Sequence, residues 1–327
     1  MYGEIIKNME KEVTVIIPSY NRANLLMETI PSYLQPEVAE LIIVDDCSSY
    51  NTKEIVKNMQ KKYPQIRYIR NEKNSKQTFS KNVGIKNAST EYIYFGDDDS
   101  VISKSTINKL LFVVKSGRAD IAGARAIYMG DFCGISQKDI VAFDNWCKSV
   151  KKIDSSHIAS FEPFESHFDH CFSKQAEMAQ VPFLPACMLC RQADAASVLF
   201  DTNYKGSAYR EETDFCLGLL KLGRKLVYVP SAVQINLPPR ISKKGGAHSD
   251  GRDFWEKSAI KCNNYFFNRH WDFIQKEFTL SSSYEEIILD TEYQIKSTKN
   301  TNNGKFLKLL KRFYWKFLLL PKYGETK

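Results

Sequence analysis

Residues 13–22 read VTVIIPSYNR, an almost unbroken apolar run that ends in a proline and a polar cluster. Such a run is typical of a strand buried on both faces of a parallel sheet, and Pro18 is expected to end it. Apolar residues then recur at helical spacing to about Tyr33, and Asn21 stands where it could cap that helix. The stretch therefore predicts a strand followed by a helix, the first half of a βαβ unit.

The same alternation continues over the first 130 residues. Three further apolar runs are separated by helical patterns: the expected strands are 41–44 (LIIV), 66–69 (IRYI) and 92–95 (YIYF), and the expected helices are about 53–62 and 78–88. Strands and helices at this spacing predict right-handed βαβ units. The fold class is therefore α/β, with a mostly parallel central sheet flanked by helices.

Polar residues gather where the expected strands end. The clusters are Ser19 to Arg22, Asp45-Asp46, Arg70-Asn71 and Asp97-Asp98-Asp99. Ligands of such sheets bind beyond the carboxyl ends of the strands, so the clusters predict a binding site at that edge. The three consecutive aspartates of FGDDDS (95–100) repel one another unless a cation neutralises them, which suits a hard divalent ion. Aspartate-rich strand ends also occur as turns and helix caps.

From about Ala119 the pattern loosens. Residues 130–180 show no clear periodicity and are interpreted as an insert or an irregular substrate-side region. Periodicity then returns, and Pro230 is expected to end the last strand. The expected elements of this part are strands over 120–129 and 226–229 and helices over 191–199 and 211–222.

Four segments share their motifs and their order with a known family. They are 13–34 (VTVIIPSYNRANLLMETIPSYL), 41–49 (LIIVDDCSS), 80–100 (SKNVGIKNASTEYIYFGDDDS) and 210–233 (REETDFCLGLLKLGRKLVYVPSAV). Together they resemble family 2 inverting glycosyltransferases with the GT-A fold, over about residues 12–235. The resemblance implies a GT-A domain over 1–235, with a nucleotide-sugar half over about 12–118 and an acceptor and catalytic half over about 119–235.

The resemblance also implies roles on the donor side. Tyr20 would lie near the base, and Arg22 would approach the ring edge or a phosphate. Asp46 would accept from the ring N–H of a uracil or thymine; its neighbour Asp45 is an alternative, and both could instead cap the following helix. Lys81 stands where the family often has Arg, which keeps the charge but loses bidentate phosphate geometry, and it could also lie on a solvated helix face. The implied donor-binding set is Pro18, Tyr20, Asn21, Arg22, Asp46, Lys81, Asp97 and Asp98.

A divalent metal, Mn²⁺ or Mg²⁺, is implied by the two-aspartate motif. Asp97 and Asp99 match that motif, and the last of them would bind an ion that bridges the diphosphate. Many relatives add a His after the late strand, but here the position reads Gln234-Ile235-Asn236. Asn236 could serve as an oxygen ligand, His248 could reach in from a glycine-rich loop, or the ligand could be lost.

The resemblance places the catalytic base in Glu211-Glu212-Thr213-Asp214. Inverting transfer needs a carboxylate that takes a proton from the acceptor hydroxyl as the hydroxyl attacks the anomeric carbon. Glu212 is the predicted base, with Glu211 and Asp214 as alternatives. The same acids would also interact favourably with the N-terminal end of a helix, without any catalysis.

The end of the chain changes character. Residues 236–295 are expected to form a loop and a helical extension, and 296–304 a linker. Residues 305–320 read KFLKLLKRFYWKFLLL, a basic strip beside a wide aromatic and aliphatic face. This pattern favours a helix over 305–327 that lies on a membrane surface; residues 305–320 would form about 24 Å of helix and are too charged to span a membrane. Docking on the protein itself or on a partner is the alternative.

Composition limits the partners. Lys and Arg total 46 against 38 Asp and Glu, a formal net charge of +8 that favours anionic ligands. The basic residues concentrate in the tail and one loop, which disfavours nucleic acid. The charged N-terminus disfavours a signal peptide, and the eight cysteines lack framework spacing. We therefore expect a cytoplasmic protein, peripheral at the inner face of the cell membrane.

The function that these features favour is transfer of a sugar from a nucleotide-sugar donor, preferably a UDP-sugar, to a glycan or lipid-linked acceptor. The setting would be cell-surface polysaccharide biosynthesis. A sugar-nucleotide pyrophosphorylase would want a glycine-rich loop after the first strand, and PSYNRAN (18–24) has no glycine. A membrane-attached, nucleotide-binding scaffold without catalysis is the other alternative.

Overall fold

A central sheet organises the structure, a computed structural model that describes residues 11–49, 51–128, 177–237 and 250–297. The strands in these ranges are β1 (Val13–Ser19), β2 (Val38–Asp45), β3 (Ile66–Arg70), β4 (Tyr92–Phe95), β5 (Ser100–Ile102), β6 (Ile121–Tyr128), β7 (Ala179–Gln180), β8 (Met188–Arg191) and β9 (Leu226–Asn236). The helices are α2 (Ala23–Tyr33), α3 (Thr52–Lys62), α4 (Lys76–Asn87), α5 (Thr106–Lys115), α8 (Gln192–Val198), α9 (Glu211–Lys221), α10 (Arg252–Phe278) and α11 (Tyr284–Ser297).

The sheet is mostly parallel, as the sequence predicts. Its order is β3-β2-β1-β4-β8-β6-β9-β5, with β7 paired to β9. The four strands from β3 to β4 are parallel, and β6 and β9 are parallel to each other. The short strands β5, β7 and β8 run antiparallel to their neighbours. The carboxyl ends of the long strands therefore share one edge.

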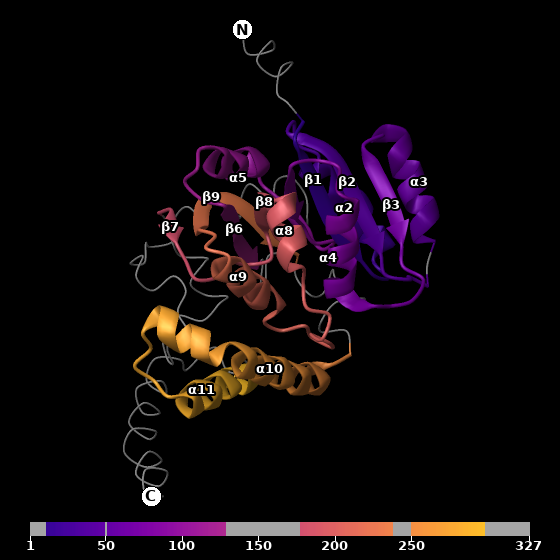
Figure 1. Cartoon of the computed structure of the whole chain (residues 1–327). Helices are drawn as coiled ribbons and strands as arrows, with labels where there is room; N and C mark the ends of the chain where they lie inside the picture. The colour runs from indigo at the N-terminus through magenta and orange to yellow at the C-terminus, as the bar shows by residue number, and fades with distance from the viewer. Residues whose placement is uncertain (1–10, 50, 129–176, 238–249, 298–327) are drawn as a thin grey trace, which may run out of the picture.

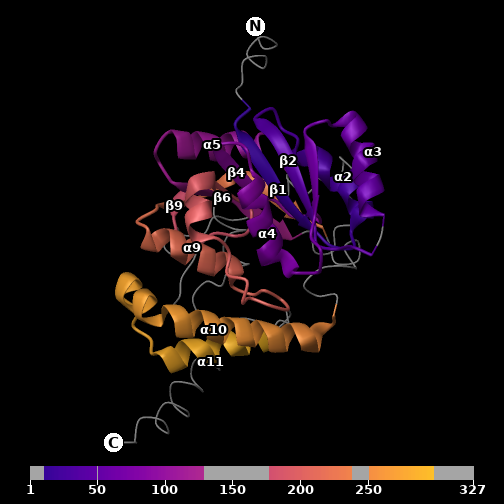
Figure 2. The same ribbon diagram turned by 45° about the vertical axis from the view of Figure 1, so that its right-hand side comes forward.

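Helices lie on both faces of the sheet (Figure 1), and an apolar core fills the space on each face. Successive side chains of a strand point to opposite faces, so Val15 packs into one core and Ile16 into the other. The first core holds side chains of α2, α3 and α5, and the second holds side chains of α4, α8 and α9. Helices α10 and α11 join the second core and lie side by side below α9 in both ribbon views (Figure 2).

Helix α4 lies unusually close to the sheet. A Cβ at Gly84 would stand 2.3 Å from Ile16 Cγ2, so only glycine permits this approach. The helix begins after β3, at the carboxyl edge of the sheet, and its first half carries Lys81. The close packing therefore holds Lys81 at the edge where the polar clusters meet.

Both prolines that were expected to end a strand lie inside one. Strand β1 continues through Pro18 to Ser19, because its pairing with β4 ends at Ile16 and Pro18 has a strand partner only on the β2 side. Strand β9 continues past Pro230 to Asn236 because the pairing with β6 shifts register there.

Several expected features fall outside the described residues. These are His248, most of the irregular region 130–180, the linker from 298 and the basic, aromatic segment 305–320. Within the described residues, no helix is both long enough and apolar enough to cross a membrane.

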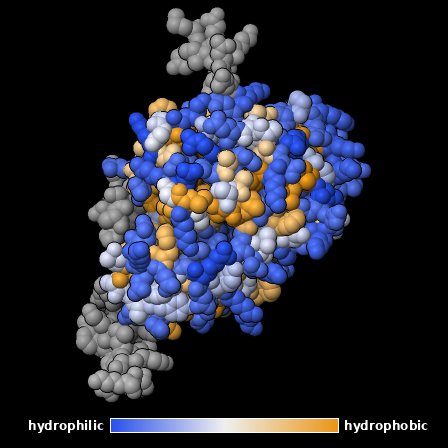
Figure 3. All heavy atoms as spheres, in the orientation of Figure 1, coloured by the Kyte–Doolittle hydropathy of each residue, from blue (hydrophilic) through white to orange (hydrophobic). Residues whose placement is uncertain are grey.

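The surface seen in Figure 3 is mainly hydrophilic, with a smaller group of hydrophobic residues near its centre. Large apolar side chains that are exposed come from several different elements: Met27, Phe79, Phe112, Met178, Leu222, Phe254 and Leu289. Singly exposed apolar residues of this kind are ordinary on soluble folds and do not by themselves mark a partner.

Candidate active site

Arg22 joins the aspartate cluster after β4 to the start of α2. Its Nη1 donates to Asp98 Oδ1 at 2.7 Å and to Asp99 Oδ2 at 2.8 Å. Asp98 Oδ2 also accepts from Ser19 Oγ at 2.8 Å, so both oxygens of this buried carboxylate have protein donors. Burial alone would lower the pKa of Arg22, but the charges of Asp98 and Asp99 raise it. Arg22 is therefore a permanent cation beside the aspartates.

Asp97 has a different partner, the late-strand residue Gln234. Gln234 Nε2 donates to Asp97 Oδ2 at 2.8 Å, and Tyr94 OH donates to Gln234 Oε1 at 3.0 Å, which orients the amide. Burial and the nearby charge of Asp99 raise the pKa of Asp97 to about 7. The negative charges of Asp97 and Asp99 thus disfavour each other, as expected where a cation or a cationic ligand binds.

Asn236 lies next to this pair, and its Oδ1 accepts from Gln234 Nε2 at 3.4 Å. Its Oδ1 also accepts from Ser100 Oγ at 2.8 Å, and the longer Gln234 side chain is the one that reaches Asp97. The described residues contain no group of three or more His, Cys, Asp or Glu side chains that could hold a metal ion. A metal ligand at Asn236 or His248 stays a prediction.

Asp45 and Asp46 are both buried and neither caps α3, so the capping alternative is wrong. Asp45 Oδ2 accepts from Tyr68 OH at 2.5 Å and from Arg70 Nη1 at 2.7 Å. Asp46 Oδ1 accepts from Asn71 Nδ2 and from the Ser75 backbone N–H, both at 2.8 Å. Its Oδ2 accepts from the backbone N–H that begins α4, at 2.7 Å. Asp46 therefore holds the loop between β3 and α4 at the sheet edge.

The loops after β1 and β2 are bonded to each other. The Asn21 backbone N–H donates to Ser48 Oγ at 2.9 Å, and Asn21 Oδ1 accepts from the Ser49 N–H at 2.8 Å. Asn21 therefore joins the two loops, and the prediction that it caps α2 is wrong because no side chain caps this helix. Pro18, near the end of β1, and Tyr20, in the loop that follows, are both half-buried and lie within the expected nucleotide region.

Lys81 connects α4 to the acidic motif of α9. Its Nζ lies 2.8 Å from Glu211 Oε1 and 3.3 Å from Glu212 Oε1, although these residues are 130 positions apart. Glu211 Oε1 also accepts from Gln77, and the Glu211 side chain is fully buried, whereas that of Glu212 is 17% exposed. Of the two glutamates, Glu212 is the one that solvent and a ligand can reach.

The pKa shifts show that these charges lie within range of one another. Burial lowers the pKa of Lys81, but Glu211, Glu212 and Asp97 outweigh it and the net shift is upward, so Lys81 stays protonated. Burial raises the pKa of Glu211 well above its usual value while Lys81 opposes that rise. The charge of Glu212 in turn contributes to the raised pKa of Asp97. The end of β4, the first half of α4 and the first turn of α9 therefore meet at one place.

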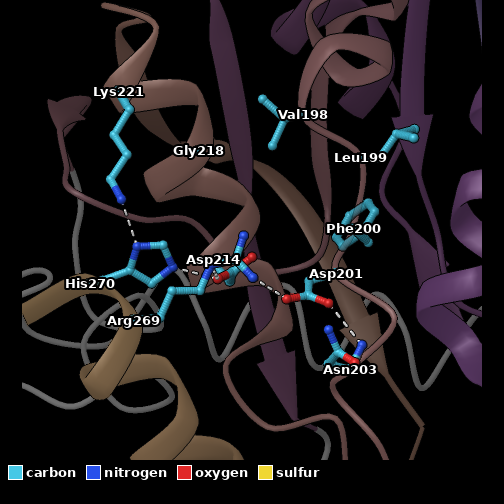
Figure 4. Close-up of a pocket in the computed structure, with 10 residues that line it drawn as sticks. All are labelled: Val198, Leu199, Phe200, Asp201, Asn203, Asp214, Gly218, Lys221, Arg269 and His270. Carbon is cyan, nitrogen blue, oxygen red and sulfur yellow. Dashed lines mark hydrogen bonds and ion pairs between the residues drawn. The ribbon is translucent and has the colours of Figure 1, made fainter.

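Asp214 points away from the point where the end of β4, α4 and α9 meet. It lines a separate cavity of about 310 Å³ between α8, α9 and α10, where its Oδ1 lies 2.5 Å from His270 Nε2 (Figure 4). Asp214 and Glu212 thus belong to different surroundings, and Asp214 is not placed beside Lys81.

Residues 14–170 match the family model described as glycosyl transferase family 2. The matched segment, just under half of the chain, is a glycosyl transferase family 2 segment. The aspartates after β4 lie inside the matched range. The elements α9, β9, α10 and α11, which carry the acidic motif, Gln234 and His270, lie beyond it.

Two curated members of the family illustrate the similarity. One is the GalNAc(5)-diNAcBac-PP-undecaprenol beta-1,3-glucosyltransferase of Campylobacter jejuni, 35% identical over 34% of this chain and 37% of that protein. The other is the poly(ribitol-phosphate) beta-N-acetylglucosaminyltransferase TarP of Staphylococcus aureus, 32% identical over 34% of this chain and 35% of that protein. The chain thus matches little more than a third of the length of these two family 2 relatives.

Solved structures share the GT-A fold of the family. The mannosyltransferase PcManGT from Pyrobaculum calidifontis, in complex with GDP-Man and Mn²⁺, has a TM-score of 0.53 at 15% identity and covers 89% of this chain and 71% of that chain. S. aureus TarS has a TM-score of 0.50 at 18% identity and covers 87% of this chain and 49% of that chain. At these identities the likeness concerns the fold alone.

The structure adds three site residues to those predicted for the family 2 domain. Gln234 was predicted only as the place of a lost His, and Gln77 and His270 were not singled out. Gln77 stands on α4 one turn before Lys81, so helical spacing could have suggested it. No local pattern indicates the bond from Gln234 to Asp97 or from His270 to Asp214, because 137 and 56 positions separate these partners.

Proposed function

We propose that this protein is an inverting glycosyltransferase that transfers a sugar from a nucleotide-sugar donor to a hydroxyl of a glycan or lipid-linked acceptor. The observation that carries the proposal is the meeting of Asp97, Lys81 and Glu212 at the carboxyl edge of the sheet. A donor side built on β1, β2 and β4 and a carboxylate on α9 are then close enough to act on one substrate pair.

Glu212 is the proposed general base. It takes the proton of the acceptor hydroxyl as the oxygen attacks the anomeric carbon from the face opposite the diphosphate. Glu211 is unsuited to this role because it is fully buried and its Oε1 accepts from Lys81 and Gln77. Lys81 instead holds the acidic pair in place, which is a different role from the donor-phosphate contact that the family resemblance implies.

The donor is proposed to be a UDP-sugar. Asp46 would accept from the ring N–H of uracil, and it keeps acceptor capacity because its carboxylate offers about four lone-pair sites and three donors occupy it here. Pro18 at the end of β1 and Tyr20 in the loop that Asn21 bonds to Ser48 would lie along the base. Arg22 would meet the sugar-phosphate part of the donor.

Asp97 and Asp99 fit a divalent cation. Mg²⁺ and Mn²⁺ are commonly held by one or two carboxylates together with substrate phosphates, so a cage made wholly of protein ligands is not needed. Burial, and after it the negative charge of Asp99, raises the pKa of Asp97, and a cation bound here would offset both effects. When bound, the ion would stabilise the leaving nucleoside diphosphate as a Lewis acid. Asn236 and His248 remain further candidate ligands.

The acceptor class is proposed from the names of the relatives. One acts on an undecaprenol-linked glycan and another on poly(ribitol-phosphate), both of which support a cell-surface glycan or lipid-linked acceptor. The basic, aromatic segment 305–320 would hold the enzyme at the inner face of the membrane, beside such acceptors.

Nucleotide binding provides the first test. We expect UDP or dTDP to raise the thermal unfolding midpoint in the presence of Mn²⁺, since a ligand at 100 times its Kd stabilises the native state by about 2.7 kcal/mol. Asp99→Ala should abolish the shift, whereas Asp272→Ala, at an exposed position on α10, should leave it unchanged. The absence of any shift with UDP, GDP, CDP and dTDP would contradict the donor site.

A further inference from the structure

The first turn of α9 is bonded to two other helices, α4 and α10. Toward the sheet, Lys81 bonds to Glu211 and Glu212. Residues advance by about 100° along a helix, so Asp214 points about 160° away from Glu212, toward α10. The element that bears the proposed base is therefore fixed between α4 and a helix that lies beyond residues 14–170, the range that matches the family model.

The shortest contact from α10 to Asp214 is made by His270, and Arg269 Nε of the same helix lies 3.9 Å from Asp214 Oδ1. His270 Nε2 lies 2.5 Å from Asp214 Oδ1, and its Nδ1 lies 2.8 Å from Lys221 Nζ (Figure 4). A lysine ammonium can only donate, so Nδ1 accepts, the ring hydrogen sits on Nε2, and His270 donates to Asp214. The side chains of His270 and Asp214 are 4% and 7% exposed, so little water competes for this bond.

A second bond holds the residue that precedes α9. Arg210 has a positive φ of 74° and is buried, with its guanidinium 5.6 Å from the Phe266 ring centre and 5.5 Å from that of Phe267. Its Nε donates to Asn263 Oδ1 at 3.2 Å, and Asn263 Nδ2 donates to Thr291 Oγ1 of α11 at 2.8 Å. Both helices of the α10–α11 pair therefore hold the start of α9.

We propose that the α10–α11 pair positions the acidic motif for catalysis, with His270 and Arg210 as positioning residues that touch neither substrate. The assignment rests on the proposed role of Glu212 as base. Without the His270–Asp214 bond, the first turn of α9 can shift, and Glu212 moves relative to the acceptor hydroxyl. Displacements of about 1 Å in a catalytic group can lower a rate by about 100-fold.

Three substitutions around the ring test this role. His270→Phe keeps a ring but removes the donor to Asp214, and it should lower kcat about ten-fold with the donor KM within about two-fold of wild type. His270→Gln keeps an N–H donor at the same reach and should restore kcat to within about three-fold. Lys221→Met leaves the Asp214 bond in place and should change kcat by less than about two-fold. Equal losses in the Phe and Gln variants would overturn the proposal.

Amide hydrogen exchange provides a readout that needs no substrate. His270→Phe should speed exchange in residues 211–216 about ten-fold and leave exchange in α4 unchanged, because the bonds that His270 makes to Asp214 and Lys221 both end on α9. Unchanged exchange in α9, or faster exchange over the whole chain, would overturn the positioning role. If the wild type transfers no sugar from any donor, the proposed function fails, and the exchange result still decides whether α10 anchors α9.

Discussion

Glu212→Gln is expected to lower kcat about a thousand-fold, because general-base catalysis contributes about 10²- to 10⁴-fold and an amide cannot take the proton. Donor affinity should stay within about two-fold, since Glu212 belongs to α9 and the proposed nucleotide contacts come from β1, β2 and β4. The change is nearly isosteric, and Lys81 keeps its shorter bond to Glu211. Steady-state release of the nucleoside diphosphate measures kcat, and titration of the donor measures its Kd.

Two comparisons make this result specific. Glu91→Gln changes a carboxylate that is 63% exposed and remote from α9, and it should leave kcat unaltered. Asp214→Asn keeps an oxygen that can accept from His270, so it should lower kcat far less than Glu212→Gln does. Wild-type turnover in Glu212→Gln would assign the base to another group. Loss of donor binding in the same variant would show that Glu212 is needed to hold the nucleotide, and the lower turnover would then not identify a base.

Lys81→Met is expected to reduce the free energy of unfolding by about 3 to 5 kcal/mol, the usual loss when one partner of a buried ion pair is removed. Glu211 would then be a fully buried carboxylate without its cation, and its Oε2 already has no hydrogen-bond partner among the described residues. Urea unfolding followed by circular dichroism measures the change. Lys86→Met, at an exposed position in the last turn of α4, should cost less than about 0.5 kcal/mol.

The pH dependence of the Lys81→Met variant has a definite sign. Burial raises the pKa of Glu211 in the folded state above its unfolded value, and Lys81 is the group that opposes this. A carboxyl with a raised folded pKa contributes stability at low pH and loses it as the pH rises through that pKa. The loss in Lys81→Met should therefore be smaller at about pH 5 than at about pH 8. An equal loss of unfolding free energy at both pH values would show that Glu211 stays ionised in the variant.

Much of the fold follows from local pattern. The apolar runs that form β1, β2, β3 and β4 are continuous because these strands are buried on both faces. The sequence also predicted the helices between them to within a few residues of their observed bounds. The errors occur at Pro18 and Pro230, where the outcome depends on which neighbouring strand is present. A short sequence window carries no information about a missing strand partner or a register shift.

The candidate site was predictable where its residues are consecutive. The Asp97–Asp99 cluster and the acidic motif beginning at Glu211 stand out because like charges rarely gather without a ligand or a counter-charge. The counter-charge itself was not predictable: Lys81 reaches α9 across 130 residues, and Gln234 reaches Asp97 across 137. Helical spacing shows that Asp214 and Glu212 point apart, but only the packing of α10 supplies His270 as the partner.

The most direct measurement of the central claim is sugar transfer by the purified protein. UDP-linked sugars and lipid-linked glycan acceptors would be incubated with it and Mn²⁺, while nucleoside diphosphate release is followed and the anomeric configuration of the product is read by proton NMR. We predict release that depends on both donor and acceptor, with inversion at the anomeric carbon. Release with retained configuration, or no transfer from any nucleotide-sugar while UDP binds, would contradict the account.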